Sequence, residues 1–308
     1  MMYGTQERFE YFQCSKCKAL QIVTAPRNLA KYYPQDYYSI SFKEPKVSII
    51  KTFIKALLFK IPLLLRNEKL YQNISKIIYK IIDGSIANII FYSKATNQSR
   101  ILDVGCGNGN LLWHLCELGY TKTIGIDPYV QDDIVYQNGV KVYKNNLENY
   151  ISKANIPQFD LIMFNHSLEH VETSHIETLI LASKMLSKNG LILLRLPTVS
   201  SHAWEKYREA WFNLDAPRHI ILHSIESIDY ICKKSGLNII KKYYESGAMQ
   251  FFGSELYQRN IPFLDEQGHP QDLNKFFSKK ELQRFQKDSE KLNKEEKGDW
   301  ISIICQKK

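Results

Sequence analysis

Three glycines at alternate positions follow an apolar segment in the stretch ILDVGCGNGN, residues 101–110. The glycines are Gly105, Gly107 and Gly109, and the apolar segment carries one acid, Asp103. Because glycine has no Cβ, the chain can turn sharply at these positions, and another group can lie directly against the backbone. The stretch therefore predicts a strand that ends in a ligand-binding loop, as in folds that bind ligands at strand ends.

Two common phosphate-binding loops do not match this glycine spacing. A P-loop ends in Gly-Lys-Ser or Gly-Lys-Thr, whereas Gly109 is followed by Asn110 and Leu111. A dinucleotide-binding loop has the pattern G-x-G-x-x-G, and its third glycine would fall at position 110, which is asparagine. The glycine loop alone does not identify the ligand, so the segments that follow it are needed to identify it.

From residue 100 onward, short apolar segments alternate with helical patterns. This order predicts an α/β fold, a Rossmann-like, seven-stranded, mostly parallel sheet with helices on both faces. The expected strands are 100–104, 122–126, 140–143, 159–164, 190–196, 237–244 and 299–306. The expected helices begin near Asn110, Gln131, Leu147, Thr173 and Ser224, and a charged helix covers 279–295.

The chain is expected to divide into three parts, 1–40, 41–98 and a main domain over 99–308. Residues 1–40 predict a small β-rich segment around a Cys-x-x-Cys turn, and 41–98 predict a basic, amphipathic helical region. Within the main domain, 246–296 contain AMQFFGSELYQRN, which is too apolar for a free loop and predicts a lid-like insertion.

The positive charge of the chain is concentrated ahead of the main domain. The stretch 41–100 has 11 Lys and Arg against three Asp and Glu, and so it carries eight of the nine net positive charges. Apolar residues in 47–64 recur at helical spacing, but the lysines among them exclude a transmembrane helix. Such a helix either packs on the main domain or makes a peripheral contact with an anionic membrane.

The composition is that of a globular protein from a reducing compartment. The 308 residues are 44% hydrophobic, which is ordinary for a chain with a large core. The N-terminus has no apolar signal segment, so a cytoplasmic location is expected. Only Cys14 and Cys17 of the six cysteines lie close together, which fits reduced thiols. A nucleic-acid partner is not expected, because the excess charge lies outside the predicted catalytic loops.

Three further features follow the glycine loop in order. The stretch TIGIDP ends the second strand with Asp127, and VKVYKNNLEN ends the third with Asn145 and Asn146. The stretch FDLIMFNHSLEHV then places a polar loop after the fourth strand. Together with the glycine loop, these features resemble the class I S-adenosylmethionine-dependent methyltransferases over residues 100 to about 245.

The resemblance implies S-adenosylmethionine as the cofactor. Asp103 and the glycine loop would hold its methionine end, Asp127 its ribose, and Pro128 would lie beside the adenine. Asn146 stands where the family often has an acid that bonds the adenine amino group, and an amide can accept that bond without charge assistance. The full set of expected cofactor-binding residues is Asp103, Gly105, Cys106, Gly107, Gly109, Asp127, Pro128, Asn146, Leu147 and Asn165.

Several stretches resemble a narrower group, bacterial methyltransferases encoded with polysaccharide and other glycan synthesis functions. They are ERFEYFQCSKCKAL, YYPQDYYS, DAPRHIILHS and QFFGSELYQRNIP. Many members begin with a zinc ribbon of two Cys-x-x-Cys pairs, whereas this chain has only Cys14 and Cys17. Because a tetrahedral structural zinc needs four ligands, no metal is expected. Tyr38 and the tyrosines beside it either face a sugar or the cofactor, or pack as ordinary core side chains.

Histidine is the side chain best suited to remove a proton from an acceptor hydroxyl near neutral pH. His166 is expected to face the cofactor cleft, and His170 to bond to the backbone. His219 lies in a loop after the fifth strand and is our first candidate for the general base, with Arg218 orienting the acceptor. Alternatively, Asp215, Arg218 and His219 brace a loop through salt bridges.

The sequence therefore predicts a methyltransferase that acts on a small-molecule or glycan acceptor, most simply a sugar hydroxyl. Two alternatives stay open. One is an RNA (tRNA) methyltransferase, which the charge favours, although no RNA-binding module is visible. The other is an inactive regulatory protein that binds the cofactor without turnover, for which Asn146 is the one indication.

Overall fold

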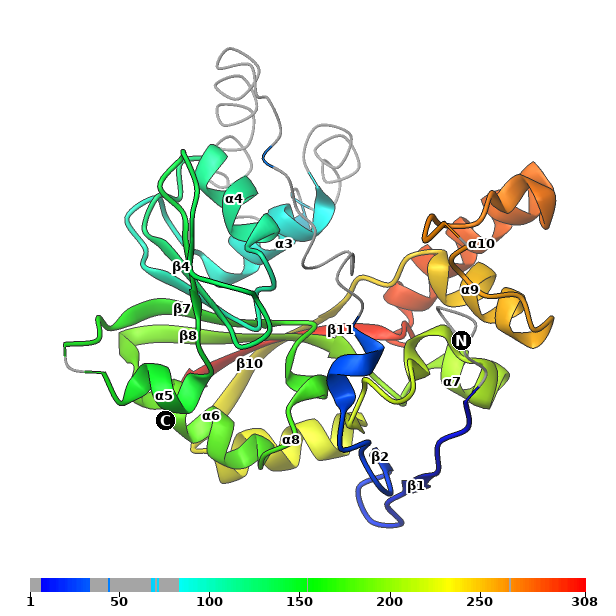
Figure 1. Ribbon diagram of the computed structural model, residues 1–308, viewed down its shortest axis with the longest axis horizontal. Coiled ribbons are helices and arrows are strands. Elements are labelled where there is room, and N and C mark those ends of the chain that lie inside the picture. Colours follow the sequence, from blue (N-terminus) through cyan, green and yellow to red (C-terminus); the bar gives the residue numbers. More distant parts are fainter. Residues whose placement is uncertain are drawn as a thin grey trace.

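An eight-stranded sheet forms the centre of the computed structural model, which describes residues 7–33, 44, 68, 69, 71 and 83–308, apart from positions 154 and 266 (Figure 1). The strand order is β10-β11-β8-β7-β3-β4-β6-β5. The strands are β3 (Ile101–Val104), β4 (Thr123–Asp127), β5 (Ile134–Val135), β6 (Lys141–Lys144), β7 (Phe159–Asn165), β8 (Leu186–Pro197), β10 (Leu237–Tyr244) and β11 (Trp300–Lys307).

The middle of the sheet is parallel. Strands β6, β4, β3, β7 and β8 pair in parallel, and β11 lies antiparallel between β8 and β10. All four residues of β3 are buried, as expected for a strand covered on both faces. The predicted fold class is confirmed, and each of the seven expected strands is present.

Helices cover both faces of this sheet (Figure 1). Alternate strand residues point to opposite faces, so Ile101 and Leu102 belong to different core clusters. One face packs against α3 (Gly84–Ser93) and α4 (Asn110–Glu117), and the other against α5 (Leu147–Ile151), α6 (His175–Lys184) and α8 (Ile225–Lys234). The strand ends therefore lie between two helical layers, where a ligand can be enclosed.

The helix expected near Gln131 is absent, and that prediction was wrong. The segment instead forms β5, which pairs antiparallel with β6 at the edge of the sheet. The two strands are joined through Asn138-Gly139, a strong hairpin signal, and Gly139 has φ +92°. This hairpin adds the eighth strand to the seven that the sequence predicts.

A helical cap lies beside the sheet and has its own core. It consists of α7 (His202–Tyr207), α9 (Met249–Gln258) and α10 (Lys279–Lys294), together with 3-10 turns. Trp211, Phe251 and Phe285 are buried in this core. Trp211 Nε1 also donates a hydrogen bond of 3.0 Å to Asp299, just before β11. The cap is thus tied to the sheet next to the strand ends.

The N-terminal segment packs against the same side of the molecule. Strands β1 (Tyr11–Gln13) and β2 (Leu20–Ile22) form a hairpin, and β2 pairs with β9 (Ile221–Leu222) in a separate three-stranded sheet. Tyr11 donates a 2.8 Å hydrogen bond to the carbonyl of His219. The hairpin therefore supports the loop that precedes β9.

Two predictions fall outside the described residues. They are the amphipathic stretch 47–64 and the side chain of Tyr38. Among the residues that the structure describes, none belongs to a helix long and apolar enough to span a bilayer.

We predict that Gly105→Ala destabilises the fold more than Gly119→Ala. Both glycines have positive φ, +73° and +96°, so each alanine costs about 1–2 kcal/mol of backbone strain. A Cβ at Gly105 would also lie 2.4 Å from Ser167 Cβ, whereas one at Gly119 meets nothing. We expect about 1–3 kcal/mol of additional loss at Gly105 in urea unfolding. Equal losses would contradict the close packing of this loop.

Candidate active site

A large cavity opens at the carboxyl ends of the parallel strands. Its volume is about 1540 Å³, and its walls come from the loops after β3, β4, β7 and β8, with a rim from the cap. A pocket for one small ligand usually measures about 300–1,000 Å³. The cavity therefore has room for a cofactor and an acceptor side by side.

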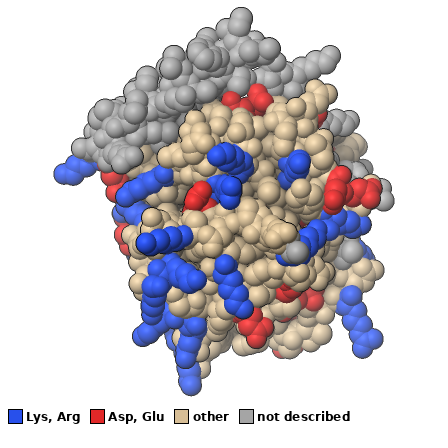
Figure 2. All heavy atoms as spheres, turned by 90° about the vertical axis from the view of Figure 1, so that its left-hand side faces the viewer, with Lys and Arg blue, Asp and Glu red and all other residues tan. Residues whose placement is uncertain are grey.

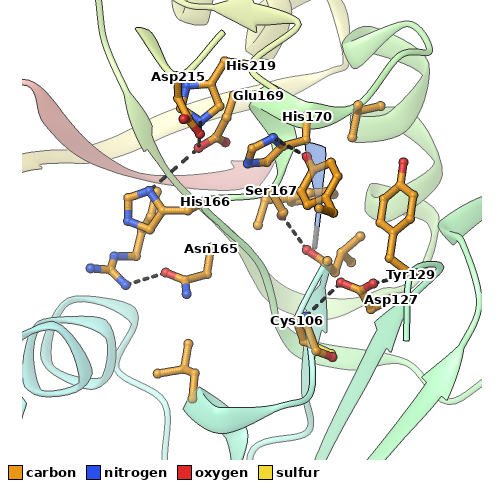
Figure 3. Close-up of a pocket in the computed structure, with 18 of the residues that line it drawn as sticks. Cys106, Asp127, Tyr129, Asn165, His166, Ser167, Glu169, His170, Asp215 and His219 are labelled. Atoms are coloured by element: carbon orange, nitrogen blue, oxygen red, sulfur yellow. Dashed lines mark hydrogen bonds and ion pairs between the residues drawn. The ribbon is translucent and has the colours of Figure 1, made fainter. Parts of the chain in front are cut away.

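The glycine loop and Asp127 meet in the floor of this cavity (Figure 3). Asp127 Oδ2 accepts a 2.8 Å hydrogen bond from Gly107 N, and Oδ1 accepts one of the same length from Tyr129 N. Burial raises the pKa of this carboxyl, and the two N–H groups oppose the shift. Each oxygen keeps a lone pair that could accept a ligand hydroxyl.

Asp103 lies beneath the loop and not in the cavity wall. It is 1% exposed, and its Oδ1 has no hydrogen-bond partner among the described residues. Burial raises its pKa to about 8, while the guanidinium of Arg195 opposes the shift. A buried carboxyl of this kind suits a positively charged ligand group, because a nearby cation would stabilise the ionised form.

Most of the expected cofactor-binding residues line the cavity. They are Gly105, Cys106, Gly107, Asp127, Pro128, Asn146, Leu147 and Asn165. Gly109 lies outside the wall, where its missing side chain makes room for Val142. Asn146 caps α5, since its Oδ1 accepts a 2.8 Å hydrogen bond from Asn149 N. The amide oxygen of Asn146 therefore already accepts a hydrogen bond that stabilises the start of α5.

A buried ion pair supports Asn165 at the end of β7. The guanidinium of Arg195 donates to Asn165 Oδ1 and, at 2.8 Å, to Glu245 Oε1. Arg195 reaches the cavity wall although it is 4% exposed. The sequence analysis did not identify Arg195, because one arginine within an apolar strand, RLP, resembles an ordinary strand end.

Three histidines surround one carboxylate on the other side of the cavity (Figure 3). His166 Nδ1 lies 3.8 Å from Glu169 Oε1, and His219 Nε2 lies 4.0 Å from the same oxygen. The rings of His170 and His219 are 4.7 Å apart. The segment NHSLEH thus contributes its acid as well as its histidines, whereas the sequence analysis considered only the histidines.

Glu169 is the most deeply buried member of this cluster. Its side chain is 1% exposed, and both oxygens lack a hydrogen-bond partner in the described part of the chain. Burial alone would raise the pKa of Glu169, but His166, His170 and His219 together lower it to about 2. An ionised carboxylate therefore faces the cavity from behind the three rings.

The loop that carries His219 is braced from within. Arg218 Nε donates a 2.8 Å hydrogen bond to Asp215 Oδ2, and Arg218 is 3% exposed. Arg218 is not part of the cavity wall, where it would have to lie to orient an acceptor. Its ion pair with Asp215 fits the alternative in which these residues brace the loop. His219 does reach the cavity, and its Nδ1 lies 2.7 Å from the carbonyl of Asn213.

The N-terminal segment contributes a tyrosine to the site. Tyr33 stacks on Tyr129, with ring centroids 5.4 Å apart, and its hydroxyl lies 3.1 Å from His170 Nδ1. Both tyrosines line the cavity. Tyr33 is one of the tyrosines near Tyr38 that were expected either to face a ligand or to pack in the core, and it lies in the cavity wall.

We predict that Asp103→Asn changes the pH dependence of stability. The pKa of Asp103 rises from 3.8 to about 8 on folding, so between these values the folded protein holds a proton that the unfolded chain has released. The free energy of unfolding of the wild type should therefore decrease from about pH 4 to about pH 8. The variant should lose this decrease in urea titrations, and the exposed control Asp132→Asn should keep it. Identical profiles for wild type and Asp103→Asn would contradict the shifted pKa.

Comparisons with known proteins identify the family of the chain. A family model described as a methyltransferase domain matches residues 74–242, more than half of the chain. The tRNA U34 carboxymethyltransferase of Pseudomonas fluorescens SBW25 is 26% identical over 190 residues, and the match covers 56% of this chain and 58% of that protein. The chain thus spans less than two thirds of this curated relative.

Two solved structures among those similar to the chain are matched at low sequence identity. A SAM-dependent methyltransferase from Archaeoglobus fulgidus is 20% identical, with a TM-score of 0.45 over 72% of this chain and 93% of that one. The cyclopropane synthase MmaA2 from Mycobacterium tuberculosis is 17% identical, with a TM-score of 0.46 over 73% and 85%. The family model matches more than half of the chain, over the parallel strands and the glycine loop, and the chain therefore belongs to the methyltransferase domain family.

Proposed function

We propose that this chain is an S-adenosylmethionine-dependent methyltransferase that acts on a hydroxyl group of a small-molecule or glycan acceptor, with His166 as the general base. The observation that carries the proposal is the composition of the cavity. A glycine loop with Asp127 forms one wall, and histidines with an ionised glutamate form the opposite wall. Bound S-adenosylmethionine supplies a sulfonium methyl group, so the protein has to supply alignment and a proton acceptor.

The glycine-loop wall is suited to the cofactor. The backbone at Gly105 and Gly107 lines the cavity, and Asp127 is positioned to accept hydrogen bonds from both ribose hydroxyls. Asp103, buried below without a partner for Oδ1, would attract the positive charge of the methionine end. We assign the adenine to the side of Pro128, Tyr129 and Leu147.

His166 has the position that a general base requires. Its side chain is 28% exposed to the cavity, whereas that of His219 is 8% exposed. Its backbone has φ +53°, a conformation that non-glycine residues seldom adopt and that often accompanies function. The ring would take the proton of the acceptor hydroxyl as the oxygen forms its bond to the methyl carbon and the carbon–sulfur bond breaks. Glu169, 3.8 Å away, would then stabilise the imidazolium.

The remaining wall suits a ring-shaped acceptor. The rings of Tyr33, Phe212, Phe263 and Trp300 line the cavity, and Trp300 lies 4.5 Å from the ring of His166. Aromatic faces suit the apolar faces of sugar rings, and a few polar groups then fix orientation. This combination supports a glycan or nucleotide-sugar acceptor next to His166.

A transfer-RNA substrate is the second candidate. The curated relative is named for tRNA U34, and the net charge of the chain is +9. Figure 2 shows lysine and arginine side chains spread over one face, with uncharged surface and acidic side chains between them. RNA-binding proteins usually have a basic patch or stripe. A filter-binding assay with tRNA at physiological salt distinguishes the candidates, since saturable binding favours RNA and its absence the small acceptor.

Peripheral membrane contact through 47–64 stays a prediction, because that stretch is outside the described residues. It would fit a lipid-linked glycan acceptor, since an amphipathic basic helix binds anionic bilayers. We expect the enzyme to act on the cytoplasmic side of such a membrane.

We predict that the purified protein binds S-adenosylhomocysteine in calorimetric titration and does not bind NAD. Asp127→Ala should weaken this binding at least tenfold, because it removes the acceptor of two ribose hydroxyls and an anchor of the glycine loop. Asp132→Ala, an exposed acid five residues further along, should bind as the wild type does. Failure of the wild type to bind would overturn the assignment of this wall.

We predict that His166→Gln lowers turnover about 100-fold or more while S-adenosylhomocysteine binds unchanged. Formation of S-adenosylhomocysteine would be measured with a panel of nucleotide sugars and glycolipids, and the best acceptor used for the comparison. His114→Gln, an exposed histidine on α4, serves as the matched control. Wild-type turnover by His166→Gln would exclude His166 as the base, and no turnover of any acceptor would favour the inactive regulatory alternative.

A further inference from the structure

We propose that Glu169, His170 and His219 bind a divalent transition-metal ion beside the acceptor. One ligand atom of each residue lies within 4.8 Å of the other two, and all three residues line the cavity. Two imidazole nitrogens and one carboxylate are a donor set typical of zinc, iron and manganese sites. From the sequence no metal was expected, because a structural zinc needs four ligands and only Cys14 and Cys17 were available for a ribbon, while His219 lies far from Glu169 and His170 along the chain.

Both histidine rings are held so that one nitrogen is available to a metal. His219 Nδ1 lies 2.7 Å from the carbonyl of Asn213, and His170 Nδ1 lies 2.9 Å from the carbonyl of Arg218. A carbonyl can only accept, so each Nδ1 carries the proton and each Nε2 keeps its lone pair. Metal-binding histidines are commonly oriented in this way by a backbone carbonyl or a carboxylate.

The carboxylate of Glu169 is the second, independent indication. It is 1% exposed, and neither oxygen has a hydrogen-bond partner among the described residues. A buried, ionised carboxylate is strongly destabilising unless a cation or several donors face it. A bound metal ion would supply such a cation, with Glu169 as one of its ligands.

The nearby acid Asp215 is already neutralised. Arg218 donates two hydrogen bonds to it, one to each carboxylate oxygen. Asp215 Oδ2 lies 3.9 Å from His219 Nε2, so it contributes negative potential to the site without being needed as a ligand. The acid of the cluster that has no hydrogen-bond partner among the described residues is therefore Glu169, which lies between the histidines (Figure 3).

The spacing requires only a small contraction. Ligand atoms around a tetrahedral zinc ion lie about 3.4 Å apart, given metal–ligand bonds of about 2.0–2.1 Å. His219 Nε2 and Glu169 Oε1 are 4.0 Å apart, and the ligand atoms of all three residues lie within 4.8 Å of one another, so side-chain movements of about 1 Å bring them into range. Three protein ligands leave a coordination position open, as in catalytic zinc sites, and here it would face the cavity.

An ion at this position would give the acceptor wall a second function. A hydroxyl bound to a metal ion loses its proton more readily, and His166 lies next to the cluster to receive that proton. This role rests on the proposed hydroxyl methylation, whereas the binding of the ion does not. The two can therefore fail separately.

The test measures metal retention with Co²⁺ and Zn²⁺ as probes. The purified chain is loaded with each ion and dialysed, the metal is quantified by mass spectrometry, and Co²⁺ coordination is followed by visible absorption. All measurements are made in a Cys14→Ser/Cys17→Ser background, because two nearby thiols could hold either ion. Glu169→Gln and His219→Gln remove ligands, and His114→Gln is the exposed control. S-adenosylhomocysteine binding reports in every variant whether the cofactor side has folded.

We expect the background protein and His114→Gln to retain about one equivalent of metal, and both ligand variants to bind at least tenfold more weakly, with cofactor binding unchanged. Two results would overturn the site: no retention in the background protein, which lacks both Cys14 and Cys17, or retention unaffected by Glu169→Gln and His219→Gln. If the background protein retains metal but does not bind S-adenosylhomocysteine, that result would instead count against the proposed cofactor wall.

Discussion

The close approach of Gly105 to Ser167 joins the two halves of the active site. A Cβ on Gly105 would lie 2.4 Å from Ser167 Cβ, and the Ser167 hydroxyl donates to the carbonyl of Val104. This contact exists because β3 and β7 are parallel neighbours, so their following loops leave the sheet at the same edge. One loop is the glycine loop and the other carries His166 and Glu169. The pairing of β3 with β7 and the packing of Ser167 on Gly105 therefore hold the two loops together.

Three buried acids at this edge are each stabilised in a different way. Asp127 accepts two backbone N–H groups, Asp103 has a raised pKa that favours its neutral form, and Glu169 is ionised among histidines. A protein that buries carboxylates without full pairing loses stability, and such groups cluster where function requires them. Asp103 lies beneath the glycine loop and suits a cationic ligand group, whereas Glu169 lines the cavity among the histidines and suits a metal ion.

Segments from both ends of the chain enclose these walls. The N-terminal hairpin adds a strand to β9 and places Tyr33 over His170 and Tyr129. The cap contributes Met249 and Phe263 to the rim. Enclosure of this kind excludes water from a reaction centre and strengthens the electrostatic interactions inside it. The cap also reaches the histidine cluster through Asp299, since Asp299 binds Asn213, whose carbonyl orients His219.

The fold class, the glycine loop and, apart from the segment near Gln131, the order of strands and helices could be predicted from the sequence alone. Apolar periodicity and glycine spacing are local properties, and parallel strands bring their carboxyl ends to one edge whatever the details of packing. The edge hairpin at Asn138-Gly139 was missed, although its signal is also local. Only the tertiary structure decided that Glu169 is the centre of the site, that Arg218 braces a loop, and that Arg195 supports Asn165. These roles depend on burial and on contacts between segments far apart in the chain, and neither spacing nor residue type specifies which buried carboxylate will be left without a partner.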